Sequence, residues 1–249
     1  MSPASTAPAY APVSPLVRSP SRFGTGSGLS FAVTAIYVAG IAFFSALLTR
    51  RATTLPQPSR SKGLIRFIKG APLLVTMVFM YGFADIAAIS AMPAYLVHVG
   101  FSQAFAATAV TMVALPTAIS QPVVGWLLDH VNRPAIGIGA ALLASVSFFL
   151  IPFIEGGPAF LIVFAMLGAA SFALYTCALT LLGERYSGDA LVSGSAAYSL
   201  AYAAGSGSGS TVVGAVMSGH SLAAGPVTIG AALAVFALFY MLREWRRLR

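Results

Sequence analysis

Asp85 is the residue most able to do chemistry in this chain, because it is an acidic side chain inside a long apolar stretch, residues 72–97. An ionisable group near the middle of a membrane span costs roughly 2.5–3.5 kcal/mol on insertion scales, so it is expected to face a cavity or a partner. Tyr81 lies one helical turn earlier on the same face and can donate a hydrogen bond to it. A low dielectric favours the neutral carboxyl, which could exchange protons. Asp85 is therefore expected either to bind a proton or cationic group, or to be a structural, hydrogen-bonded aspartate.

Other polar residues occur in pairs four apart within apolar stretches, so each pair shares one helical face. These pairs are Thr117 and Gln121, Ser171 and Tyr175, and Tyr198 and Tyr202. They could line the same path as Asp85, or they could hydrogen-bond neighbouring helices at about 0.6 kcal/mol each. No lysine or arginine lies in these stretches. An anionic ligand would therefore find no buried counter-charge.

Enzyme and cofactor chemistry finds little support in the sequence. His98, His130 and His220 are scattered and form no His-x-x-x-His metal pair, and neither a nucleophile elbow nor a phosphate-binding loop with suitable partners is present. A retinal protein would need a lysine deep in a helix, but Lys62 and Lys69 lie outside the apolar stretches. We expect no enzyme activity, no metal and no cofactor.

The elements that must position these residues are membrane-spanning helices. The chain is 58% hydrophobic and 8% charged, with a mean hydropathy of +0.87, which is far too apolar for a water-soluble domain. Asp85 is the only formally charged residue within the seven stretches, each near the ~20 residues that cross a bilayer. Backbone groups in lipid must be paired within the segment, so an all-α fold with about seven transmembrane helices is predicted. The stretches are 29–48, 72–97, 104–127, 135–154, 159–182, 191–217 and 224–242.

The basic residues predict an orientation. If residues 49–71 face the cytoplasm, every lysine and arginine except Arg18 and Arg22 falls on the cytoplasmic side. Positive residues favour that side, so the N-terminus is expected outside and the C-terminus inside. The net charge of +8 could suggest a nucleic-acid partner. The basic residues lie next to apolar stretches, however, as they do in membrane proteins, so nucleic acid is not an expected partner.

Two segments outside the spans have distinct compositions. Residues 1–28 are rich in Pro, Ser, Ala and Thr and predict a disordered tail, or an artefact of where the reading frame was started. Residues 49–71 form a basic linker that could contain an amphipathic helix. Its apolar residues, available to touch lipid, are Leu64, Ile65, Phe67 and Ile68.

The sixth stretch, 191–217, is unusually rich in glycine and serine. Gly205 and Gly209 are four apart and share a face, which lets a neighbouring helix approach closely. Dense glycine also lowers helix propensity, by about 1 kcal/mol per residue relative to alanine. These two residues and Gly214 are therefore predicted to serve close packing, gating or both.

A short charged turn, Gly125–Pro134, separates two of the apolar stretches and must sit at the membrane surface. Asp129 can accept hydrogen bonds from the N–H groups at a neighbouring helix N-terminus. Arg133 can pair with Asp129 or with a headgroup phosphate. The alternative is a solvated turn whose charges only set the topology.

This order of stretches and turns resembles the C-terminal half of a major facilitator superfamily transporter, preceded by that family's sixth helix. The segment Gly125-Trp-Leu-Leu-Asp129-His-Val-Asn-Arg133 is similar to the family's loop motif. The run from Gly168 to Tyr175, the sequence Gly183-Glu-Arg-Tyr and the glycine-rich stretch resemble helices ten and eleven of bacterial efflux-type members. The sequence departs from the family pattern at His130, Asn132, Pro134 and Ser210.

The resemblance implies a first transmembrane helix at 29–48, a cytoplasmic linker at 49–71 and a six-helix bundle at 72–249. It also implies secondary active transport of a small solute by alternating access, with possible proton coupling, in the inner membrane of a bacterium. The loop cluster would latch two bundles together. The implied partners are the lipid bilayer, a small-molecule substrate, and a second half-transporter chain or a homodimer. The alternative is a non-transporting seven-helix protein, such as a receptor, a scaffold or a degenerate remnant.

Overall fold

The computed structural model describes residues 26–51, 61–247 and 249. These residues form eight α-helices and one short 3-10 helix, η1, with no strand among them. In chain order they are α1 (Gly26–Arg51), α2 (Ser61–Gly70), α3 (Pro72–His98), α4 (Gln103–His130), α5 (Arg133–Leu150), η1 (Ile151–Phe153), α6 (Gly157–Arg185), α7 (Gly188–Gly219) and α8 (Ala224–Arg247).

The chain divides into two units, Met1–Gln57 and Pro58–Arg249. In the described part of the first unit there is a single helix, α1, whose apolar segment is Ala35–Leu47. The predicted tail, 1–28, lies almost wholly outside the described residues, and α1 begins at Gly26.

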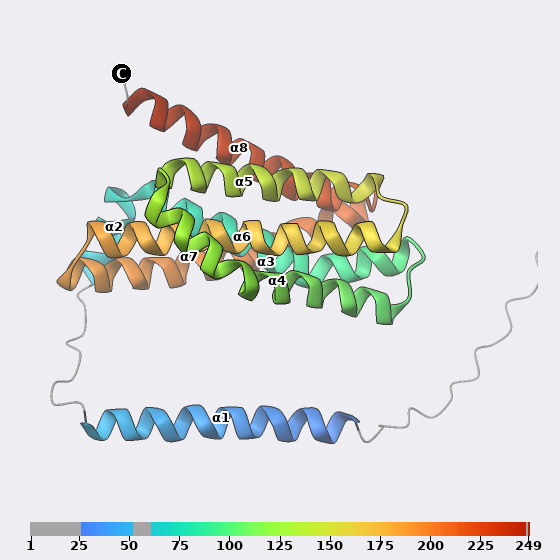
Figure 1. Ribbon diagram of the computed structural model, residues 1–249, viewed down its shortest axis with the longest axis horizontal. Helices are drawn as coiled ribbons and strands as arrows, with labels where there is room; N and C mark the ends of the chain where they lie inside the picture. The colour runs from blue at the N-terminus through green and yellow to red at the C-terminus, as the bar shows by residue number, and fades with distance from the viewer. Residues whose placement is uncertain (1–25, 52–60, 248) are drawn as a thin grey trace, which may run out of the picture. The chain divides into compact units, whose positions relative to one another are not determined.

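The second unit is a bundle of long helices joined by short turns (Figure 1). α3 packs along α7 and also touches α4, α6 and α8, while α6 packs against α4 and α5, and α5 against α8. Because α3 has neighbours on most sides, it is the most deeply buried of the membrane-length helices, and α4 is the least buried.

Local sequence explains where these helices begin. Ser102 caps α4, since its hydroxyl accepts a hydrogen bond from the Phe105 N–H at 3.1 Å. Prolines occupy the first turns of α3, α5 and α6, where the missing N–H has no intrahelical partner to lose. Gly100, with φ of 110°, forms the turn between α3 and α4, a left-handed conformation that favours glycine.

Five of the described helical segments are long and apolar enough to cross a membrane: α3, α4, α5 with η1, α6 and α8. α7 is longer than any of them, but its glycine- and serine-rich sequence makes it less apolar, and α1 contributes the shorter apolar segment. The predicted all-helical, polytopic membrane fold is confirmed. The seven long helices occupy the seven predicted stretches, with ends shifted by a few residues.

The predicted amphipathic helix of the linker is present as α2, but most of its apolar face does not point to lipid. Phe67 is 6% exposed and meets the Tyr186 ring edge to face, with ring centroids 4.9 Å apart. Leu64 and Ile68 pack against the core beside it, and Ile65 is exposed. The expectation of lipid contact was wrong for Phe67, because the aromatic surface of the bundle buries its ring, whereas Leu64 and Ile68 are only partly buried.

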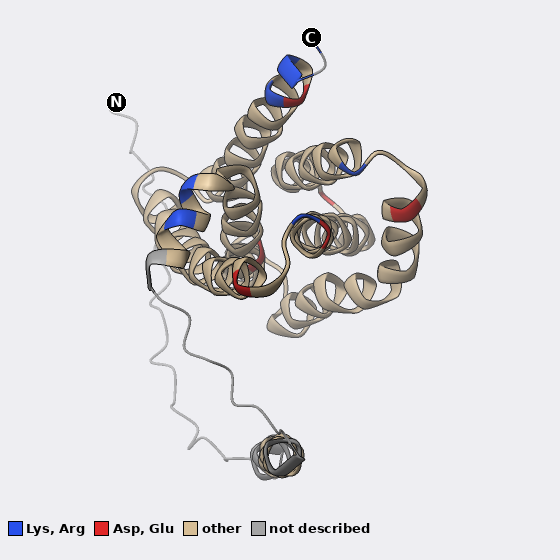
Figure 2. Ribbon diagram, turned by 90° about the vertical axis from the view of Figure 1, so that its left-hand side faces the viewer, with Lys and Arg blue, Asp and Glu red and all other residues tan. Residues whose placement is uncertain are grey.

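Charged residues gather at one end of the bundle. The turns of this up-and-down bundle bring α2, the start of α5, the end of α6, the start of α7 and the end of α8 to the same end, which Figure 2 views. The basic residues there whose side chains are described are Arg66, Lys69, Arg133, Arg185, Arg243, Arg246, Arg247 and Arg249.

Candidate functional site

The candidate site is centred on Asp85, halfway along α3. Tyr202 of α7 donates its hydroxyl hydrogen to Asp85 Oδ2 over 3.2 Å, so the carboxylate links two helices. Tyr81 lies one turn earlier on α3 and interacts with the same carboxylate. Asp85 is only partly buried, so the group remains open to a ligand.

Glycines bring α3 and α7 together at this point. A Cβ added at Gly205 would overlap the carbonyl oxygen of Phe79, and one at Gly209 would overlap the carbonyl oxygen of Phe83. From the other side, a Cβ at Gly82 would lie 2.7 Å from the Tyr202 carbonyl oxygen. The Tyr202 hydroxyl reaches Asp85 because these glycines let the two backbones approach.

Gly214 behaves differently from the other two glycines predicted for α7. A Cβ added there would meet no atom within 4 Å among the described residues. Close packing against α3 therefore stops before this residue, which lies beside a separate cavity between α3 and α7.

An aromatic cluster surrounds the carboxylate. The Tyr81 ring stacks on Tyr175 of α6, with centroids 4.9 Å apart, and lies 5.6 Å from the Tyr202 ring. Phe172 meets Tyr81 edge to face at 5.8 Å. Three helices, α3, α6 and α7, thus converge on one polar group held within aromatic rings. Tyr175 and Tyr202, far apart in the sequence, come together here with Asp85.

A cavity of about 330 Å³ opens beside this cluster. It is lined by Tyr175, Leu179, Ser195, Tyr198, Ser199 and Tyr202. Tyr175 and Tyr202 belong both to the cavity and to the cluster around Asp85, so a ligand in the cavity would contact the tyrosine that donates to the carboxylate. Aromatic faces with a few hydroxyl groups suit a small organic solute.

A second polar contact joins α4 to α6. Gln121 Oε1 accepts a hydrogen bond from the Thr176 hydroxyl over 2.9 Å, while its side-chain N–H donates to the Thr117 carbonyl oxygen over 3.0 Å. The Thr117 hydroxyl donates to its own helix, at the Val113 carbonyl oxygen. Sequence reasoning missed Thr176, although its position next to Tyr175 in an apolar stretch was a usable signal.

Two of the candidate residues have more buried positions. Tyr198 is 3% exposed and its hydroxyl donates to the Ala178 carbonyl oxygen over 2.8 Å, which ties α7 to α6. Ser171 is 3% exposed, and its hydroxyl has no hydrogen-bond partner among the described residues. Of these two residues, Tyr198 lines the cavity and Ser171 does not.

The loop motif is arranged around an ion pair that the sequence did not predict. Arg133, at the start of α5, pairs with Glu184 at the end of α6. Asp129 is exposed on the last turn of α4 and has no ion pair among the described residues. A Cβ added at Gly125 would meet nothing within 4 Å in the described bundle. The motif thus presents, at the charged end, a carboxylate without an ion pair among the described residues and a glycine with no close neighbour there.

Within the described residues, no group of three or more His, Cys, Asp or Glu side chains is placed to hold a metal ion. Asp85 is the carboxylic acid at the centre of the site, within a shell of tyrosines. Such a site can exchange a proton or attract a cation, and its aromatic faces can stack with an apolar ligand.

Comparison with known families agrees with this membrane bundle. No curated protein matches the chain. Residues 21–210 match the model of the Major Facilitator Superfamily, which is more than half of the sequence and includes Asp85, the loop motif and the Tyr202 region. The chain therefore belongs to the major facilitator superfamily, a family of membrane transporters.

Proposed function

We propose that this protein is a secondary active transporter that moves a small solute past Asp85 by alternating access. The observation that carries the proposal is the Asp85–Tyr202 hydrogen bond between α3 and α7, beside a cavity that shares Tyr202 and Tyr175. Asp85 would bind a proton or the cationic group of the solute. The resemblance to efflux-type members predicts that the solute is exported.

The chemistry of Asp85 supports a coupling between ligand binding and helix movement. An ionised carboxylate accepts the Tyr202 hydrogen bond strongly, whereas a protonated or cation-bound carboxyl accepts it more weakly. Occupation of Asp85 therefore weakens one of the polar contacts between α3 and α7. A change in that contact is a means of linking ligand binding to helix movement.

A second helical bundle is the proposed partner of the exposed apolar face of α4. α4 exposes large apolar side chains on one face, including Ile119 at 69%, Val123 at 59% and Trp126 at 58%. In a bilayer such a face contacts lipid or another bundle, and alternating access requires two bundles with the site between them. The second bundle could belong to another half-transporter chain or to a second copy. Asp129 would be its contact at the charged end.

The proposed membrane is the inner membrane of a bacterium, with the charged end of the bundle in the cytoplasm. The basic residues of α2, α5, α6 and α8 all support this orientation, since positive residues favour the cytoplasmic side. The N-terminus would then lie outside, and the C-terminus inside.

The test is transport by the full chain in proteoliposomes. A pH gradient would be imposed, and movement of ethidium, a lipophilic cation, and of protons, reported by trapped pyranine, would be followed by fluorescence. We expect gradient-driven ethidium movement in the unmodified protein and its loss in Asp85→Asn, because the amide can neither release a proton nor attract a cation. The matched control is Glu155→Gln, an exposed acid in the connection before α6.

Unchanged pH dependence and unchanged transport in Asp85→Asn would end the coupling role of this residue. Absence of both fluxes in the unmodified, monodisperse protein would reject ethidium transport by the chain. In that case a panel of small amines and neutral sugars, measured by membrane electrophysiology, would decide between another solute and a protein that moves none.

A further inference from the structure

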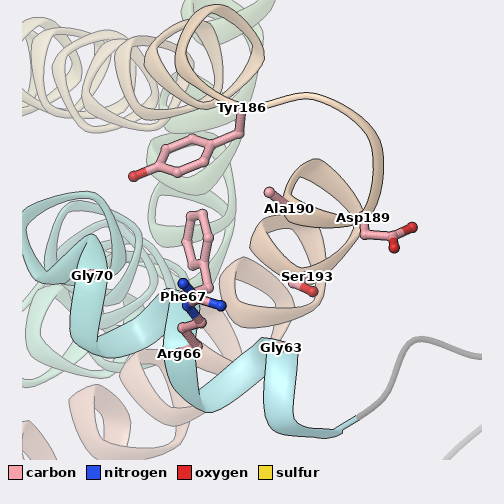
Figure 3. A pocket seen from close by; sticks show the side chains of 8 residues that line it. All are labelled: Gly63, Arg66, Phe67, Gly70, Tyr186, Asp189, Ala190 and Ser193. Atoms are coloured by element: carbon pink, nitrogen blue, oxygen red, sulfur yellow. The ribbon is translucent and has the colours of Figure 1, made fainter.

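A second cavity lies at the charged end of the bundle, away from Asp85. It has a volume of about 460 Å³ and is enclosed by α2, the connection between α6 and α7, and the first turns of α7 (Figure 3). Its residues come from segments far apart in the sequence. Whatever binds there contacts the linker helix and the bundle at once.

The inner wall of this cavity is aromatic. Figure 3 shows the Phe67 ring pointing from α2 toward the Tyr186 ring. Phe67 is held in place from behind, because a Cβ added at Gly194 would lie 2.9 Å from its ring. The wall is therefore closely packed, and its aromatic faces suit the region of an amphiphile next to the headgroup.

The cavity also carries polar groups without partners. Ser193 is 6% exposed, and among the described residues its hydroxyl makes no hydrogen bond. This hydroxyl lines the cavity, so it is free to donate a hydrogen bond to a ligand there. Ser193 faces the cavity from α7, opposite Gly63 of α2.

Two opposite charges line the same cavity without pairing. Arg66 lies on α2 next to Phe67, and Asp189 lies in the first turn of α7, with its carboxylate at the outer rim in Figure 3. Both side chains are exposed, and neither forms an ion pair with any described residue. A ligand with a negative and a positive group a few bonds apart would satisfy both.

We propose that this cavity binds the headgroup of a phosphatidylethanolamine lipid. Its phosphate contacts Arg66 and accepts a hydrogen bond from Ser193, its primary ammonium donates to Asp189, and its glycerol esters lie against Phe67 and Tyr186. An anionic headgroup without an ammonium would face Asp189 unfavourably. A choline headgroup carries no N–H donor for the carboxylate.

The position of the cavity suits this ligand. α2 is amphipathic and basic, and it lies at the ends of helices long enough to cross a bilayer, which is where headgroups are found. The proposal does not depend on Asp85 or on transport. A bound lipid would hold α2 to the bundle at the membrane surface.

The test is native mass spectrometry of the full chain in detergent, titrated with dioleoyl phosphatidylethanolamine, phosphatidylcholine and phosphatidylglycerol. We expect the protein to retain phosphatidylethanolamine best. Arg66→Gln should weaken all three lipids, because all three carry the phosphate. Asp189→Asn should weaken phosphatidylethanolamine selectively, by about two- to fivefold for a solvent-exposed charge contact.

Control variants separate the cavity from a generally basic surface. Lys69→Gln removes a neighbouring charge of α2 outside the cavity, and Glu155→Gln removes an acid at another turn; both should leave the lipid preference unchanged. Arg66→Lys and Asp189→Glu should restore binding. Equal losses in Arg66→Gln and Lys69→Gln, or a preference for phosphatidylethanolamine over phosphatidylcholine that persists in Asp189→Asn, would overturn the proposal.

Discussion

The contact between α3 and α7 makes the sharpest prediction for stability, through Gly209→Ala. An added methyl group would overlap the Phe83 carbonyl oxygen and lie 3.0 Å from the Phe83 Cα. Both atoms belong to a helix backbone, so no rotamer change can relieve the clash. Overpacking of this kind destabilises by about 1–3 kcal/mol.

Gly207→Ala is the matched control, because it lies two residues earlier on the same helix and its added methyl would meet nothing within 4 Å. Alanine favours a helix over glycine by up to about 1 kcal/mol, and this term is common to both variants. The difference between the two variants therefore isolates the packing term, about 1–3 kcal/mol or roughly a five- to 150-fold change in the folding equilibrium.

The measurement is an SDS titration of each variant in mixed micelles, followed by far-UV circular dichroism. We expect Gly209→Ala to unfold at a lower SDS fraction than Gly207→Ala. Gly205→Ala, which overlaps the Phe79 carbonyl oxygen, should behave like Gly209→Ala. Equal midpoints for the packed and the open position would refute the close approach of α3 and α7 described here.

Three further predictions concern contacts between other elements. Phe67→Ala should release α2 from the bundle, because it removes the ring buried against Tyr186, and amide hydrogen exchange in α2 should rise while that in α3 does not. Thr176→Val should cost about 0.6 kcal/mol in the same SDS titration, since it removes the hydrogen bond to Gln121 between α6 and α4; no loss would show that the bond contributes nothing. Glu184→Gln should lower stability by less than about 1 kcal/mol, because this carboxylate and its partner Arg133 are both more than a third exposed, and the effect should shrink at high salt.

The lengths of the apolar stretches and the residues that bound them were sufficient to predict the helices. Apolar stretches bounded by charged, proline and glycine residues end within a few residues of the observed helices, because a bilayer requires the backbone to be paired inside each segment. The spacing of Gly205 and Gly209 also predicted which face of α7 meets a neighbour, since residues four apart share a face in any α-helix. Spacing could not show that Gly214 lies beyond that contact.

The partners of polar residues needed the tertiary structure. The sequence pointed to Tyr81 on the same helix as a partner of Asp85, and the structure adds Tyr202 on α7, whose hydroxyl donates to the carboxylate over 3.2 Å. Arg133 was expected to pair with Asp129 or with a headgroup phosphate, and in the structure it pairs with Glu184. Neighbours on one helix follow from its period, but partners on different helices depend on crossing angles and axial offsets, which one sequence does not contain.

The sequence by itself determined the membrane environment, the helical class, the position of Asp85 within a span and the gathering of basic residues at alternate turns. These follow from transfer free energies and from helical periodicity, which act residue by residue. Only the tertiary structure decided that α2 packs its apolar face on the bundle, that Tyr175 and Tyr202 meet beside Asp85, and that Arg66, Asp189 and Ser193 line one cavity. Such groupings arise from side-chain packing between distant segments, so they exist only once the helices are assembled.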